Sequence, residues 1–171
     1  MTTIVMPVEG VLVDRPAYDS MLNYEVTDEG RDLFNLLKSQ GRLILLSSDP
    51  SEDRVKAWLI RERLVGYSQV YVRPANSAVE PNQWRIDRMV EMMGIGHRIS
   101  YYVDTDPVAI GKAMDLGVTS LLLGVPGTRP GQEKGSSGPS PWYSLVQRVE
   151  AQNTLRAEMA QRESEASVSS S

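Results

Sequence analysis

Short apolar runs alternate with amphipathic segments through the first 125 residues of the chain. Runs of strand length lie at 4–6, 42–48, 69–73, 98–104 and 118–124. Segments with a helical pattern of apolar residues lie between them, at 27–41, 49–64, 82–93 and 107–117. The pattern predicts five strands separated by four helices.

Strands that are apolar along their whole length are typical of parallel sheets with helices on both faces. Regular alternation of strand and helix is typical of the same architecture. We therefore expect an α/β fold of three layers, with a mainly parallel central sheet of about five strands.

Residues that favour helix starts support these boundaries. Thr27 or Asp28 can cap the first helix, and Pro50 suits the first turn of the second. Asp106 can cap a helix that begins at Pro107. The buried faces are expected to hold Leu33, Phe34, Leu36 and Leu37 in the first helix, and Trp84, Ile86, Met89, Val90 and Met93 in the third. Met89, Met92 and Met93 are expected to serve core and subunit packing.

The last third of the chain differs in composition from the core expected at 1–125. Segment 126–141 is rich in glycine, proline and serine and predicts a loop, 142–163 predicts a helix, and 164–171 predicts a disordered tail. Trp142, Leu145, Val146 and Val149 have the spacing of a buried helix face. Leu155 and Met159 continue the helix with fewer apolar residues. We expect a protein partner or a second copy to bind through Trp142, Leu145, Val149, Leu155 and Met159; the alternative is a frayed, solvated tail.

Composition narrows the function classes. The net charge of −4 argues against sequence-independent nucleic-acid binding through a broad basic face. The chain has no cysteine and a single histidine, His97, which is expected to be an exposed loop residue. No apolar run approaches the roughly 20 residues that span a bilayer, and no basic segment precedes the first apolar run as in a signal peptide. A cytoplasmic protein is expected: host cytoplasm, or virion-associated if phage-encoded.

Polar residues follow each apolar run, where a parallel sheet places its ligand crevice. They are Pro7 and Glu9 after the first run, Ser47, Ser48 and Asp49 after the second, Arg73 and then Arg85 after the third, and Asp104 and Asp106 after the fourth. We expect these groups to converge on one edge of the sheet. Ser47, Ser48 and Arg73 are candidates for binding a ligand, and Asp104 and Asp106 for binding magnesium.

At these positions the chain resembles the haloacid dehalogenase-like (HAD) superfamily. The stretch "PVEGVLVD" is similar to the family's first motif, "LILLS" to its second, and "YYVDTDP" followed by "AIGKAMDLGVTSLLL" to its fourth and the end of its core. The resemblance covers Thr2 to Val125 and implies a Rossmann-like core without a large cap domain. The segment "VRPAN…PNQWRID" also resembles, more faintly, the phosphatase half of phage-type polynucleotide kinase–phosphatases.

The departures from the family pattern concern its catalytic groups. Pro7 stands where the family has its nucleophilic, magnesium-binding aspartate, and Glu9 where it has its acid/base aspartate. The family's third-motif lysine has no counterpart, and Arg85 is the nearest candidate. Proline offers neither a lone pair nor a charge, so covalent phosphoryl transfer is not expected.

Several of these residues also have a simpler interpretation, in which they bind neither a ligand nor a metal. Glu9 could be an acid/base or a metal ligand, although a solvated loop carboxylate is the favoured expectation. Ser47 could bind an anion, cap a helix or simply end a strand. Asp106 is expected to cap a helix whether or not a metal binds. No cofactor is expected, other than magnesium if there is any.

Two functional hypotheses follow. The first is a catalytically inactive HAD-like pseudoenzyme that acts as a protein-binding or assembly module, which could be phage-encoded. The second is a residual magnesium-dependent phosphatase on nucleotides or nucleic-acid ends, which would use Glu9 or a water in place of the nucleophile.

Overall fold

The structure is a computed structural model that describes residues 2–13 and 24–123, together with residues 145–147, 149–151, 154–155, 158–159 and 162 of a C-terminal helix. The chain divides into two units, Met1–Pro126 and Gly127–Ser171, and each is described by itself.

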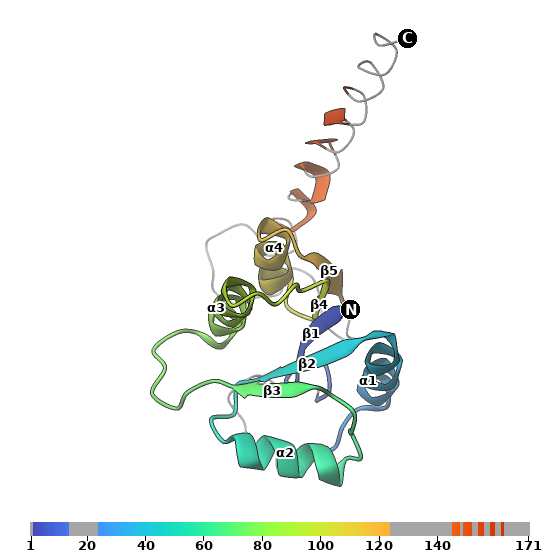
Figure 1. Cartoon of the computed structure of the whole chain (residues 1–171), viewed down its shortest axis with the longest axis vertical. Coiled ribbons are helices and arrows are strands. Elements are labelled where there is room, and N and C mark those ends of the chain that lie inside the picture. Colours follow the sequence, from blue (N-terminus) through green and yellow to red (C-terminus); the bar gives the residue numbers. More distant parts are fainter. Residues whose placement is uncertain are drawn as a thin grey trace, which may run out of the picture. The chain divides into compact units, whose positions relative to one another are not determined.

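The first unit is built on a five-stranded parallel sheet, as the sequence predicts (Figure 1). Its strands are β1 (Thr3–Pro7), β2 (Arg42–Ser47), β3 (Gln69–Val72), β4 (Tyr101–Asp104) and β5 (Thr119–Leu122). Their order is β3-β2-β1-β4-β5. β2 and β3 therefore extend the sheet on one side of β1, and β4 and β5 extend it on the other side. The carboxyl ends of β2, β1 and β4 are adjacent as a result.

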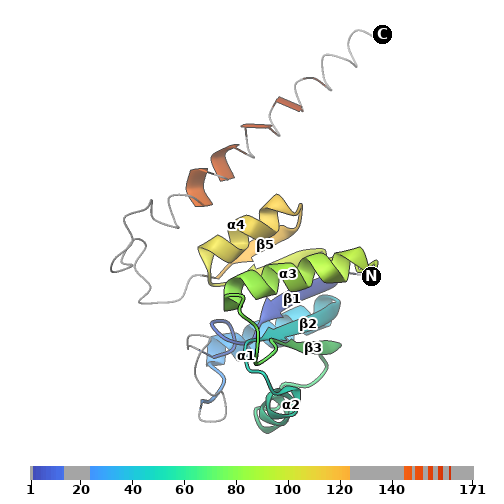
Figure 2. The same ribbon diagram turned by 90° about the vertical axis from the view of Figure 1, so that its left-hand side faces the viewer.

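Four helices connect the strands and form the outer layers. They are α1 (Asp28–Gln40), α2 (Glu52–Arg61), α3 (Pro81–Gly94) and α4 (Pro107–Asp115). Figures 1 and 2 show α1 and α2 on one face of the sheet and α3 and α4 on the other. The result is the three-layer, Rossmann-like α/β architecture expected from the alternating pattern.

Side-chain caps fix the starts of three helices. Thr27 Oγ1 accepts from the N–H of Gly30, and Asp106 accepts from the N–H groups of Val108 and Ala109, as expected. The expectation for the second helix was wrong, because α2 begins at Glu52 and its cap is Ser51. Pro50 precedes the cap and lies outside the first turn.

The core between the sheet and α1/α2 joins side chains from all of these elements. Phe34, Trp58 and Leu45 are at most 1% exposed and belong to one buried cluster. Met89 and Met92 are fully buried on α3, which confirms their expected place in the core. Three other residues expected to be buried are exposed, because they face solvent from the outer sides of their helices: Leu36, Val90 and Met93.

In the second unit, the described positions from 145 to 162 are helical. Leu145 is buried as expected, but the expectation of a buried face was wrong for Val146 and Val149, which are exposed. Leu155 and Met159 are exposed as well. Trp142, the expected loop at 126–141 and the expected tail at 164–171 lie outside the described residues. In the part of the chain that the structure describes, no helix is both long enough and apolar enough to span a membrane.

The turn from α1 into β2 generates a prediction about stability. A Cβ on Gly41 would lie 2.4 Å from the carbonyl oxygen of Thr2, which accepts from the N–H of Arg42 at the start of the β1–β2 pair. We expect Gly41→Ala to lower the free energy of unfolding by about 1–3 kcal/mol, because the backbone must move. The measurement is urea unfolding followed by circular dichroism.

Gly94→Ala is the matched control. Gly94 is the last residue of α3, and a Cβ there would meet nothing within 4 Å. Alanine should therefore leave stability unchanged or raise it by up to about 1 kcal/mol. Equal losses in the two variants would contradict the close approach at Gly41.

Candidate functional site

A tight loop after β1 carries Glu9 to the carboxyl end of β2. The N–H of Val8 bonds to the carbonyl of Leu46, and the N–H of Leu12 returns to the carbonyl of Val8, both at 2.8 Å. Gly10 has a φ of +87°, and a Cβ there would lie 2.7 Å from Thr105 Oγ1. Glycine is required at this turn both by the positive φ and by the approach of the loop to β4.

Glu9 is buried at the end of β2. The hydroxyl of Ser47 donates to Glu9 Oε1 at 2.6 Å, and the N–H of Ser48 donates to Oε2 at 3.0 Å. Glu9 is only 3% exposed. The expectation of a solvated loop carboxylate was therefore wrong, because strand-end donors replace water around the carboxylate.

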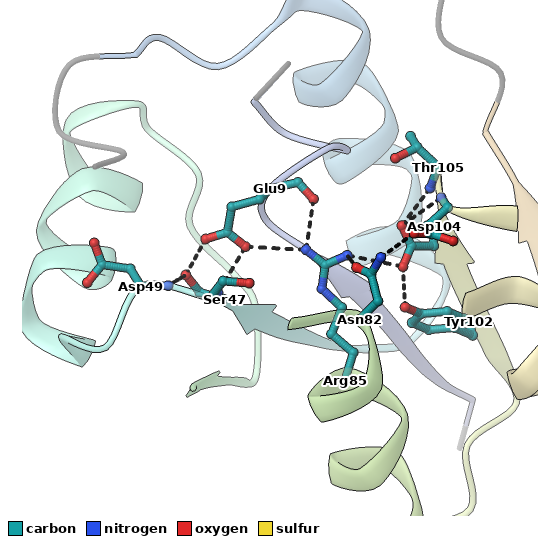
Figure 3. A network of polar contacts seen from close by, with 10 residues as sticks. Glu9, Ser47, Asp49, Asn82, Arg85, Tyr102, Asp104 and Thr105 are labelled. Atoms are coloured by element: carbon teal, nitrogen blue, oxygen red, sulfur yellow. Dashed lines mark hydrogen bonds and ion pairs between the residues drawn. The ribbon is translucent and has the colours of Figure 1, made fainter. Parts of the chain in front are cut away.

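Arg85, one turn into α3, inserts its guanidinium between Glu9 and Asp104 (Figure 3). Its Nη1 lies 3.3 Å from Asp104 Oδ2, and its Nη2 lies 3.7 Å from Glu9 Oε2. Nη2 also donates to the main-chain oxygen of Glu9 at 3.3 Å, and Nη1 donates to Asn82 Oδ1 at 3.2 Å. The Arg85 side chain is 4% exposed. We call Arg85, Glu9, Asp104 and their partners Ser47, Ser48, Asn82 and Tyr102 the Arg85 network.

Asp104 ends β4 and has donors at both carboxylate oxygens. Oδ1 accepts from the N–H groups of Thr105 at 2.7 Å and Asp106 at 3.1 Å. Oδ2 accepts from the hydroxyl of Tyr102 and from Arg85. These donors compensate for complete burial of a charge that would otherwise be very costly.

The network shifts the pKa values of its members. Burial raises the pKa of Asp104, and the charge of Arg85 offsets only part of this effect. Burial, followed by the charge of Asp104, raises the pKa of Tyr102 well above its ordinary value. Burial alone would lower the pKa of Arg85, but the charges of Asp104, Tyr102 and Glu9 outweigh it and raise that pKa. Arg85 is therefore a permanent cation in the network.

Asp106 takes part in two local contacts. It caps α4 through Oδ1, and its Oδ2 accepts from the side-chain amide of Asn82. The capping role expected from the sequence is confirmed. Within residues 2–13, 24–123 and the described helical positions, no group of three or more His, Asp or Glu side chains could hold a metal. Magnesium binding by Asp104 and Asp106 stays a prediction.

Two of the expected ligand-binding residues have structural partners. Arg73 donates to the main-chain oxygens of Ser77 at 2.8 Å and Val79 at 2.7 Å, so it folds the loop between β3 and α3. The Ser47 hydroxyl accepts from the N–H of Asp49 at 3.1 Å while it donates to Glu9. Ser48 Oγ is buried and has no hydrogen-bond partner among the described residues. Ligand binding by these three residues is not tested by the contacts.

The sequence interpretation missed Tyr102 and Asn82. Tyr102 lies two residues before Asp104, so both side chains project from the same face of β4. Asn82 lies three residues before Arg85, so both occupy the same face of α3. Strand and helix periodicity could therefore have identified both residues once Asp104 and Arg85 were selected.

His97 also differs from expectation. It is half-buried, and its Nδ1 lies 3.4 Å from Arg42 Nη1. The prediction of an exposed residue was wrong, because the turn after α3 lies against the start of β2.

No protein-family model matches the sequence, and a search of curated proteins gave no match. Several solved structures resemble the fold, among them the following two. One is a chain of the Pnkp1/Rnl/Hen1 RNA repair complex, with a TM-score of 0.61, 14% sequence identity, and coverage of 71% of this chain and 42% of that chain. The other is a chain of a Pnkp1/Rnl/Hen1 complex, with a TM-score of 0.60, 15% identity, and coverage of 71% and 45%. This chain thus spans less than half the length of those it matches, and the likeness concerns the fold.

The Arg85 network predicts a large effect of removing its cation. Arg85→Met keeps much of the side-chain volume but leaves Glu9 and Asp104 as adjacent buried carboxylates. We expect a loss of about 3–5 kcal/mol in the free energy of unfolding at neutral pH. Arg54→Met is the control, because Arg54 pairs with Asp49 at 2.8 Å but its side chain is 45% exposed. It should cost no more than about 1 kcal/mol, and equal losses in urea unfolding would contradict the burial argument.

The raised pKa of Asp104 predicts how this loss depends on pH. A carboxyl group with a raised folded-state pKa contributes stability below its unfolded value of 3.8, and this contribution is lost as pH rises through the folded value. Without Arg85 the folded pKa rises further, so the penalty for ionised Asp104 grows. The stability difference between wild type and Arg85→Met should therefore increase as pH rises above the folded-state pKa that Asp104 has in the wild type. When Asp104→Asn is added to both proteins, this increase with pH should disappear. If it persists, another group is the cause of the pH dependence.

Proposed function

We propose that this chain is a catalytically inactive, HAD-like module that acts by binding protein partners as a subunit of an assembly. The observation that carries the proposal is the position of Arg85 between Glu9 and Asp104, with all three side chains at most 4% exposed. Groups that would have to meet a substrate are instead paired with one another.

The end of β1 supports the loss of covalent chemistry. Pro7 ends that strand and pairs in register with Leu46. In the HAD pattern that the sequence resembles, this is the nucleophile position, and proline has no group that can attack phosphorus. Glu9 is the nearest carboxylate, but Ser47 and Ser48 engage both of its oxygens.

The charges of the Arg85 network support the absence of a resident magnesium ion. Magnesium prefers carboxylate oxygens and retains several waters. Here a guanidinium already balances the carboxylates, and four donors contact the oxygens of Asp104. A cation at the same place would meet the charge of Arg85, so we propose that the protein needs none.

We propose that a module without catalytic groups acts by binding other proteins. The two similar structures are chains of a multi-protein complex, which is compatible with a subunit role. Val149, Leu155 and Met159 expose 38%, 57% and 54% of their surface in the described part of the C-terminal helix. Apolar residues exposed on one helix are suited to packing against a partner, and we propose this helix as the binding element.

A residual phosphatase is the second candidate. It is favoured by the carboxylates at the ends of β1 and β4 and by the fold likeness to a chain of an RNA repair complex. It would require Glu9 or a water to replace the nucleophile, and hence an opening of the Arg85 network.

Phosphatase assays with magnesium separate the two candidates. We expect no turnover of an aryl phosphate, of nucleoside monophosphates or of a 3′-phosphorylated RNA above that of the Asp104→Asn variant. Magnesium-dependent turnover that Asp104→Asn abolishes would overturn the inactive assignment. The Pro7→Asp/Glu9→Asp variant should also remain inactive, because Arg85 still occupies the centre of the network.

A further inference from the structure

A second polar cluster lies at the opposite edge of the sheet, near the amino ends of β2 and β3. It consists of Arg42, Gln69, Tyr71, Arg88 and His97, and we call it the Arg42–Arg88 cluster. Arg42 and Gln69 are the first residues of their strands. Arg88 lies one turn beyond Arg85 on α3, so the helix connects the two edges. None of these five residues belongs to the Arg85 network.

Gln69 joins the two sides of the cluster. Its Oε1 accepts from Arg42 Nη2 at 2.8 Å and from the hydroxyl of Tyr71 at 3.0 Å. Arg42 Nη1 lies 3.4 Å from His97 Nδ1. Gln69 thereby fixes the guanidinium of Arg42 beside an imidazole, and all of these side chains remain partly accessible.

Arg88 and Tyr71 form a stack. The guanidinium carbon of Arg88 lies 4.0 Å from the centroid of the Tyr71 ring, within the range of a cation–π contact. Arg88 Nη1 also pairs with Glu91 Oε2 at 2.6 Å, and Glu91 is 63% exposed. The contact keeps the guanidinium over the Tyr71 ring, while the ion pair with the exposed Glu91 contributes little.

The charge balance of the cluster differs from that of the whole chain. Among the residues that the structure describes, Glu91 is the one carboxylate in contact with the two guanidiniums and the imidazole, whereas the chain as a whole carries −4. A local excess of cations on an acidic protein favours an anionic ligand. Repulsion by distant acidic groups is limited, because salt screens charges beyond roughly 8 Å at physiological ionic strength.

We propose that the Arg42–Arg88 cluster binds a nucleotide unit, either free or within a single strand of nucleic acid. Arg42 and His97 would contact the phosphate, since guanidinium groups pair well with phosphate oxygens. The Arg88–Tyr71 stack would hold the base, because bases stack on guanidinium planes and aromatic rings in single-stranded recognition. A carboxylate ligand would pair with the two cations but would have no group to stack on Arg88 and Tyr71. The proposal does not depend on the chain being catalytically inactive.

The test is fluorescence anisotropy with a labelled, short single-stranded RNA and the full-length protein. We expect saturable, salt-sensitive binding that AMP competes more effectively than inorganic phosphate. If AMP competes as well as unlabelled RNA does, the site binds free nucleotides. If longer RNA competes more strongly than AMP, the site binds a strand. The proposal would be overturned if neither RNA nor AMP bound saturably. It would also be overturned if inorganic phosphate or a polyglutamate peptide competed as effectively as AMP.

Variants locate the binding. Arg42→Gln and Arg88→Gln should each weaken RNA binding about tenfold, which corresponds to the loss of about one contact of 1.4 kcal/mol. Arg88→Lys should retain attraction to inorganic phosphate but lose the preference for AMP, because an ammonium cannot stack. Arg54→Gln, on α2, is the charge-matched control and should bind as wild type does. Circular dichroism confirms that each variant is folded, and equal weakening by Arg54→Gln would show that net charge alone drives the binding.

Discussion

The packing of this protein depends on one buried cation. Arg85 reaches from α3 between the loop after β1 and the end of β4, and its guanidinium contacts both Glu9 and Asp104. These three segments are far apart in the sequence, so the guanidinium fixes the helix against two strand ends at once. Removing the cation would leave two carboxylates that are at most 3% exposed without a counterion, which is far more costly than losing an exposed pair.

The properties of arginine suit this position. A guanidinium remains charged in an environment that would neutralise other groups, and its planar fork can donate in several directions. Here it bonds to a carboxylate, a main-chain oxygen and the amide of Asn82. An ammonium group has fewer donors and a stronger hydration shell, so lysine would satisfy fewer of these acceptors. The network therefore uses its cation for packing.

Much of the fold could be predicted from the sequence, because apolar strands and helical spacing report burial directly. All five strands and four helices were expected, and so were the caps at Thr27 and Asp106. The surroundings of polar side chains were harder to predict, because they depend on contacts between distant segments. The burial of Glu9 depends on partners from distant segments, among them Ser47 and Ser48 across 38 and 39 residues. Arg73 and Arg85 follow the same strand, yet one folds its own loop and the other enters the network.

We propose that Arg85 serves as the internal counterion of Glu9 and Asp104, so that no metal is needed between them. A crystal structure grown in excess magnesium tests it most directly. The predicted result is density for the Arg85 guanidinium in contact with Asp104 and with the main-chain oxygen of Glu9, and no metal between the two carboxylates. A magnesium ion coordinated by Asp104 and Glu9, with Arg85 displaced, would contradict it.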